Sequence, residues 1–430
     1  LFLTMNRDNN TSSTKRNNRK IYRYIEYLIG SGLAVISLAI ILSGSRTAML
    51  AVLVSSGLLV VLETKLIYWI KTHVAYGEMV VLLCIIILLG GTIFGLYQLK
   101  EDSANGRLLI WRISADMIID RPLLGHGQGA FQAKYMDYQA AYFNKHPESP
   151  YRQLADNTKH PFNEFILIAV EYGVVGLSFV LLFLFFLFRN IVLSNHPLRF
   201  ICISSLVGFL VISCLSYPLQ YVSVWLLVIF YAVLTTKTVH FSWQNRSWAL
   251  GSKIIVTSLS LIALFLTVRQ AQAQIKWSNV ASRALSGEVQ TVLPEYRKLY
   301  SYFKKNPLYL YNYGAILSLA EEYDRSITIL EECKNYFNDY DLQILLARNY
   351  KNKANLKKAE NTYKYAANMV PNRFWPLYQL VKLYRRQHKI KKAHALARQI
   401  IHKKVKVPSV TIASMKSEMG KFLEGLNTNY

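Results

Sequence analysis

The residues best suited to chemistry lie in one stretch of the chain, from Asn105 to Gly176. This stretch contains two closely spaced arginines, a glycine run and a histidine, His160, that opens an apolar segment. An imidazole can take or give a proton near neutral pH, so His160 is a candidate acid or base. Apolar segments precede and follow the stretch. We therefore expect it to form a large polar loop on one face of a membrane.

The two arginines, Arg107 and Arg112, belong to the sequence GRLLIWR, which also contains Trp111. Residues five apart on a helix diverge by about 140°, so the arginines are expected on different faces. Arg107 follows Gly106 near the expected start of this helix, and Arg112 lies further inside it. An amphipathic helix without catalytic function is the alternative interpretation.

A third arginine, Arg46, lies in SGSR between two apolar segments. Insertion of an arginine at membrane depth costs about 2.5–3.5 kcal/mol, and such residues tend to be functional. The alternative is that Arg46 lies near the end of a span and extends its charged group to the interface.

The glycine run, Gly125-x-Gly127-x-Gly129, permits tight turns and close approach of the backbone to a ligand. It lacks the strand and helix context of a dinucleotide-binding motif, and no Gly-Lys-Ser/Thr follows it. His126 and His146 are rivals to His160 within the loop. No HExxH, CxxC or GxSxG pattern occurs, so zinc sites and a nucleophile elbow are not predicted.

Composition predicts the elements that position these residues. Residues 21–268 are dominated by apolar runs of about membrane-spanning length, and residues 276–430 are polar and helix-forming. We expect an all-α protein, a polytopic transmembrane helical bundle followed by a helical-repeat solenoid. The net charge of +25 is explained by cytoplasmic loops and anionic headgroups. No nucleic-acid-binding motif is present, so nucleic acid is not an expected partner.

Seven spans are predicted, at residues 24–42, 48–62, 78–99, 162–188, 200–215, 221–234 and 254–268. If the basic residues 1–20 form a cytoplasmic linker, the loop at 100–162 and the soluble half lie outside. In a bacterium this orientation means the inner membrane, with both parts in the periplasm. LFLT at the start is typical of the tail of an earlier span, so we expect that the chain lacks N-terminal helices.

The soluble half repeats with a period of 33 to 34 residues. Gly314, Ala347 and Val381 are equivalent, and a small residue follows each by twelve positions: Ser326, Ala359 and Ala393. This pattern resembles the tetratricopeptide repeat, a stacked helix–turn–helix unit. A packed basic solenoid is one interpretation. A docking surface is the other, since residues 276–430 contain 27 Lys and Arg but 12 Asp and Glu.

Three blocks of the membrane half, in this order, resemble the O-antigen ligase/polymerase superfamily of bacterial membrane glycosyltransferases. The blocks are SGSRTAMLA, NGRLLIWRISADMIIDRPLLGHGQGAF and HPFNEFILIAVEYGVVGL, within roughly residues 33–190. The resemblance implies an undecaprenyl-diphosphate-linked glycan donor and an acceptor hydroxyl on lipid A-core. It implies no metal, cofactor or nucleotide sugar.

The resemblance also implies roles for individual residues. Arg46 and Arg107 match family arginines and would hold the donor diphosphate, with Trp111 and Arg112 as weaker candidates in the same block. His160 matches the family histidine and would act as general base. Family members usually read His-Asn-Glu here, whereas this chain reads His-Pro-Phe-Asn-Glu.

Alternatives remain within and outside this class. The acceptor separates an O-antigen ligase from a protein O-oligosaccharyltransferase or a polymerase, and the repeat half raises the chance of a protein acceptor or protein partner. A non-catalytic membrane anchor for the repeat scaffold is the alternative from another class, and a transporter is disfavoured because the membrane half shows no internal symmetry.

Overall fold

The computed structural model describes residues 12–64, 91, 101–193, 197–235 and 246–427. The predicted span at 78–99 lies almost wholly outside these residues. The described residues are helical or irregular, without a strand, so the all-α prediction is confirmed. Packing divides the chain into two compact units. The first contains residues 1–101, 161–168 and 175–238, and the second contains residues 102–160, 169–174 and 239–430.

The first unit contains long apolar helices and two shorter ones. The long helices are α1 (Ser12–Leu42), α2 (Arg46–Glu63) and α7 (Glu164–Leu193), and the shorter ones are α8 (Arg199–Leu215) and α9 (Val222–Thr235). Within the described part of the chain, four helical segments are long and apolar enough to cross a membrane, namely Tyr24–Leu42, Arg46–Glu63, Glu164–Leu193 and Leu250–Leu285. The protein is therefore a membrane protein, as predicted.

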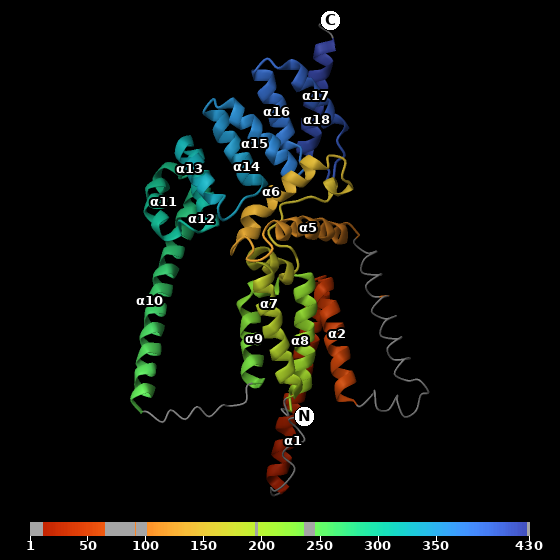
Figure 1. Ribbon diagram of the computed structural model, residues 1–430, viewed down its shortest axis with the longest axis vertical. Coiled ribbons are helices and arrows are strands. Elements are labelled where there is room, and N and C mark those ends of the chain that lie inside the picture. Colours follow the sequence, from red (N-terminus) through yellow and green to blue (C-terminus); the bar gives the residue numbers. More distant parts are fainter. Residues whose placement is uncertain (1–11, 65–90, 92–100, 194–196, 236–245, 428–430) are drawn as a thin grey trace. The chain divides into compact units, whose positions relative to one another are not determined.

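Small residues bring α2 and α8 together, and Figure 1 shows these helices side by side. A Cβ atom on Gly208 would lie 3.2 Å from the Cβ atom of Ser55, so glycine lets the two backbones approach closely. Ala51 is buried beside them. Small residues at helix contacts are typical of proteins in lipid, where van der Waals packing holds helices together.

The second unit contains the loop and the repeats. The loop residues form α5 (Glu101–Asp120), α6 (Ala130–Lys145) and the short 3-10 helix η1 (Pro150–Gln153). The remaining helices are α10 (Arg246–Leu285), α11 (Val289–Phe303), α12 (Pro307–Leu319), α13 (Tyr323–Cys333), α14 (Tyr340–Asn352), α15 (Leu356–Met369), α16 (Trp375–Arg386), α17 (Ile390–His402) and α18 (Val410–Asn427).

Paired packing confirms the repeat prediction. α12 packs on α13, α14 on α15 and α16 on α17, and the small residues Ser326, Ala359 and Ala393 are fully buried at these contacts. A Cβ atom on Gly314 would lie 2.6 Å from the side chain of Leu330, which explains the glycine at that position.

The turn inside each pair recurs with the same period. Glu321, Ala354 and His388 have positive φ angles of 64°, 58° and 56°, and they follow one another by 33 and 34 residues. Gly287, with φ of 96°, lies 34 residues earlier and joins α10 to α11. The repeats therefore begin with the pair of α10 and α11, which precedes the three units that were predicted from the sequence.

One helix connects the last span to the repeats. α10 has 40 residues, and its apolar segment starts at Leu250. At 1.5 Å per residue it is about 60 Å long, which exceeds the thickness of a bilayer. The first repeat helix is thus a direct continuation of the last span. The predicted domain boundaries at 1–20, 21–268 and 276–430 stay predictions.

Candidate functional site

Arg46 is the first residue of α2, and a short polar turn holds it there. Ser45 is the N-cap of α2, and its hydroxyl accepts a hydrogen bond from the backbone N–H of Ala48 at 3.3 Å. The hydroxyl of Ser43 accepts one from the N–H of Ser45 at 3.2 Å, and Gly44 has a φ angle of 60°. The SGSR sequence is therefore a capped helix start, which fixes a half-buried arginine at the end of a span.

Helix α5 separates the two loop arginines, as the spacing predicted. Arg107 and Trp111 are half-buried, whereas Arg112 is exposed and its guanidinium carbon lies 5.5 Å from the ring centre of Tyr142 on α6. The helix begins at Glu101, so Arg107 lies in its second turn. The prediction that Arg107 lies at the helix start was wrong, because polar residues 101–106 continue the helix toward the N-terminus.

The glycine run packs against a break in α7. Gly173 has φ of 66° and ψ of −168°, which interrupts the helix. A Cβ atom on Gly125 would lie 2.5 Å from the carbonyl carbon of Glu171, and one on Gly173 would lie 2.2 Å from the carbonyl oxygen of Leu123. Both glycines therefore allow two stretches of backbone to touch. The close approach expected for the glycine run is to the chain's own helix.

Backbone groups of the loop form hydrogen bonds with the α7 backbone groups on both sides of the break. The N–H groups of His126 and Gly127 donate to the carbonyls of Val170 and Glu171, each at 2.9 Å. The N–H of Val174 donates to the carbonyl of Pro122 at 2.8 Å. Irregular backbone within a membrane-type helix needs such partners, because unsatisfied polar groups are costly there.

The two rival histidines have local structural contacts. Nε2 of His126 lies 2.9 Å from the carbonyl oxygen of Met117, and its ring packs edge-on against Tyr138. His146 is exposed at the end of α6, 4.9 Å from the ring of Tyr142. These contacts show how both rings are packed within the loop, and Nδ1 of His126 is buried without a hydrogen-bond partner.

His160 lies in the irregular segment between η1 and α7 and is half-buried. Burial, with Lys159 next to it, holds the pKa of His160 below its ordinary value. A lowered pKa favours the neutral imidazole, the form that accepts a proton. Among the described residues, no group of three or more His, Cys, Asp and Glu side chains is arranged to hold a metal ion.

The residues after His160 fix the start of α7 within the first unit. Oδ1 of Asn163 accepts from the N–H of Ile166 at 3.0 Å, and its Nδ2 donates to the carbonyl of Cys214 at 3.0 Å. Oε1 of the buried Glu164 accepts from the N–H of Leu219 at 2.8 Å. The Asn-Glu pair therefore ties α7 to the turn between α8 and α9, which gives this block a structural role next to the histidine.

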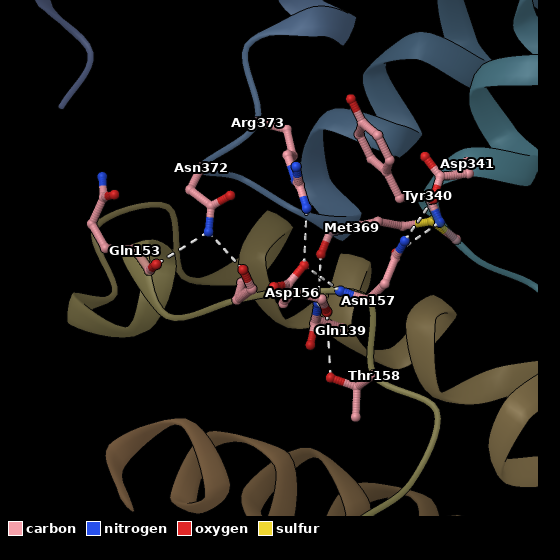
Figure 2. A network of polar contacts seen from close by, with 11 residues as sticks. Gln139, Gln153, Asp156, Asn157, Thr158, Tyr340, Asp341, Met369, Asn372 and Arg373 are labelled. Carbon is pink, nitrogen blue, oxygen red and sulfur yellow. Dashed lines mark hydrogen bonds and ion pairs between the residues drawn. The ribbon is translucent and has the colours of Figure 1, made fainter. Parts of the chain in front are cut away.

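The residues before His160 are held by the repeats, through a group of side chains that we call the junction (Gln139, Asp156, Asn157, Asn372 and Arg373). Nε2 of the fully buried Gln139 on α6 donates to the carbonyl of Met369 at 2.6 Å and to that of Asp156 at 3.1 Å. Nδ2 of Asn372 donates to the carbonyls of Gln153 at 3.1 Å and Ala155 at 2.6 Å. Figure 2 shows these side chains converging on the loop.

Two further contacts complete the junction. Asn157 donates from Nδ2 to the carboxylate of Asp341 at 3.0 Å, and its Oδ1 accepts from the N–H of Tyr340 at 3.1 Å. Arg373 pairs with Asp156 at 3.2 Å. Asn157 lies three residues before His160, so the repeats restrain the approach to the candidate base. No spacing or motif in the sequence indicated these residues.

Comparison with known proteins agrees with the predicted family. The profile of the family described as O-antigen ligase matches residues 31–181. A protein of Rickettsia conorii, provisionally named a polysaccharide ligase, is 26% identical over 145 residues, which are 31% of this chain and 33% of the relative. A Rickettsia prowazekii protein with the same provisional name is 29% identical over 143 residues, again 31% of this chain and 33% of the relative. The match thus spans about a third of each relative.

Among solved structures, MamA from Desulfovibrio magneticus is similar to 30% of this chain and 72% of its own, with 18% identity and a TM-score of 0.29. A TM-score this low does not establish a common fold. The profile match covers the segments that contain Arg46, Arg107 and His160. Residues 31–181 are therefore similar to the O-antigen ligase family, as the three sequence blocks predicted.

Proposed function

We propose that this protein transfers a glycan from an undecaprenyl-diphosphate-linked donor to an acceptor hydroxyl, and that the acceptor is lipid A-core. The observation that carries the proposal is the match of residues 31–181 to the O-antigen ligase family, since this stretch contains both candidate arginines and His160. The expected location is the bacterial inner membrane, with the loop and the repeats in the periplasm.

The donor diphosphate would be bound by Arg46 and Arg107. Guanidinium groups are always charged and bind phosphate oxygens with two parallel hydrogen bonds. Both arginines are half-buried, so their charges act in a less polar environment than bulk water. They would stabilise the negative charge that develops on the leaving diphosphate. Trp111 lies one helical turn after Arg107 and would support it.

His160 would act as the general base. The acceptor oxygen forms a bond to the anomeric carbon, while the bond from that carbon to the diphosphate oxygen breaks. The acceptor proton passes to the imidazole, and the lipid diphosphate leaves as an anion. The lowered pKa of His160 supports this role, because the imidazole is then neutral at pH 7.

The junction would keep the base in position. A general base must lie within hydrogen-bond reach of the proton it removes, so movement of the 153–160 segment is expected to reduce the rate. The repeats restrain this segment through Gln139 and Asn372. This contact supports a catalytic role for the repeats, in addition to any recruitment of a partner.

A complementation experiment tests the proposal and its acceptor. A deletion strain would receive wild type, Arg46→Ala, Arg107→Ala or His160→Ala, with protein levels measured alongside. Lipopolysaccharide and glycoproteins would both be examined for attached glycan. Loss of long glycan from lipopolysaccharide with all three variants supports the ligase. Loss from glycoproteins alone would identify a protein O-oligosaccharyltransferase, and full transfer by every variant would favour the membrane-anchored scaffold.

A further inference from the structure

A cleft of about 310 Å³ lies on the repeats next to the junction. Its lining combines loop residue Asp156 with residues from the start of α14, the α15–α16 turn and the start of α18. The side chains used below are Tyr340, Arg373, Trp375, Lys406 and Thr411. The cleft is thus built from segments far apart in the sequence, and Asp156 in its lining belongs to the same loop as His160.

The aromatic residues of the cleft differ in exposure. Tyr340 is 7% exposed, and the guanidinium carbon of Arg373 lies 5.9 Å from its ring centre. Trp375 is 41% exposed at the start of α16, and its ring centre lies 5.7 Å from that of Tyr378. An exposed indole beside a cleft offers a flat apolar face with a polar N–H, which suits a ligand that is both flat and polar.

The lining of this cleft contains two cations, Arg373 and Lys406, and the C-terminal segment that supplies most of the lining is basic. From residue 371 to the C-terminus the sequence contains 13 Lys and Arg but only 2 Asp and Glu. Asp156 is the acidic residue of the cleft lining, and Arg373 already pairs with it at 3.2 Å. Lys406 is exposed on the lining. The cleft therefore presents more positive than negative charge, which favours an anionic ligand.

Lys403 lies three residues before Lys406 and contacts the backbone of Arg373, which lines the cleft. Its Nζ donates to the carbonyl of Arg373 at 2.7 Å and lies 5.0 Å from the ring centre of Phe374. Burial, together with the charge of Arg152, lowers the pKa of Lys403 to about 7. A neighbouring anion would restore the charged form of such a lysine.

We propose that this cleft is a subsite for an acidic sugar residue of the glycan that the enzyme handles. Trp375 would stack on the sugar ring, Arg373 and Lys406 would bind its acidic group, and Thr411 would contact its hydroxyls. The proposal rests on the proposed function, because glycan is the substrate there. Asp156 lies four residues before His160 in sequence, so occupancy of the cleft would bear on the segment that holds the candidate base.

The test is a binding measurement on the full chain in nanodiscs of zwitterionic lipid. The probe is a tetramer of galacturonic acid, maltotetraose is the neutral control, and inorganic phosphate is the simple-anion control. Titration calorimetry would compare wild type with Trp375→Ala, Trp375→Phe and Lys406→Gln. Lys357→Gln on α15 is the matched control, because Lys357 is exposed and outside the cleft lining.

The acidic tetramer should bind more tightly than the neutral one. Trp375→Ala should weaken binding about tenfold, Trp375→Phe should retain most of it, and Lys406→Gln should weaken it about threefold. Lys357→Gln should leave it unchanged. Equal binding of both tetramers, equal effects of Lys406→Gln and Lys357→Gln, or full displacement by phosphate would each overturn the proposal.

A further variant separates this proposal from the transfer reaction. His160→Ala should bind the acidic tetramer as wild type does, because binding requires no catalysis. Loss of transfer with retained binding would leave the subsite intact. Conversely, an enzyme that transfers glycan but binds the tetramer no better than maltotetraose would refute the subsite and leave the proposed function standing.

Discussion

Replacing Gln139 by leucine should release the loop that leads to His160. The side chain of Gln139 is fully buried and has three partners, because its Nε2 donates to the carbonyls of Met369 and Asp156 and its Oε1 accepts from the hydroxyl of Tyr135. Leucine fills a similar volume but has no polar atoms. The two carbonyls and the Tyr135 hydroxyl therefore lose their hydrogen bonds to the Gln139 side chain. Each buried polar group left unsatisfied costs about 1–3 kcal/mol, and the carbonyl of Asp156 still accepts from the hydroxyl of Thr158, so the junction should lose about 3 kcal/mol from the other two groups.

Hydrogen–deuterium exchange of residues 153–160 measures this loss directly. Every 1.4 kcal/mol is a factor of ten, so about 3 kcal/mol should speed exchange through local opening by about a hundredfold. Gln128→Leu is the matched control, because Gln128 is exposed in the same loop. Exchange that rises equally in both variants, or in neither, would refute the view that the repeats hold this segment.

Three further predictions follow from the site. Gly125→Ala should lower thermal stability well beyond Gly127→Ala, because a Cβ atom on Gly125 meets backbone at 2.5 Å while one on Gly127 meets nothing within 4 Å; equal melting shifts would contradict this. Asn163→Ala should cost about 1 kcal/mol by removing a helix cap, measured as a lower melting temperature in detergent, and an unchanged value would argue against the cap. The pKa of His160 is lowered, so transfer should fall only as pH drops below about 6.5, and a midpoint above that value would contradict the assignment.

The membrane helices and the repeats could be predicted because both depend on local periodicity. Apolar length predicted the span at 24–42 with the bounds of the observed segment Tyr24–Leu42. Buried small residues at a period of 33 to 34 predicted the helix pairs. The break in α7 could not be predicted from hydropathy, because Gly173 lies within a largely apolar helix and the break depends on backbone bonds from residues 122–127.

The junction could not be predicted from the sequence for a different reason, which is that its contacts join distant residues. Gln139 and Met369 are 230 residues apart, and no local pattern requires a glutamine on α6 to meet the end of α15. Arginine and histidine are candidate functional residues by residue type alone, whereas the role of a buried glutamine can be recognised only when its hydrogen-bond partners are known. The interior turns of the repeats also have non-glycine residues at positive φ, such as Ala354, which composition does not indicate.

The most direct test of the central claim is transfer by the purified full-length protein. A synthetic undecaprenyl-diphosphate-linked glycan and a lipid A-core acceptor would be supplied to wild type, Arg107→Ala and His160→Ala. Arg121→Ala is the matched control, because Arg121 is an exposed arginine of the same loop. Loss of a general base, or of a group that stabilises the leaving diphosphate, reduces rates by about a hundredfold or more, so His160→Ala and Arg107→Ala should be nearly inactive while Arg121→Ala transfers normally. Wild-type transfer by His160→Ala would contradict the account.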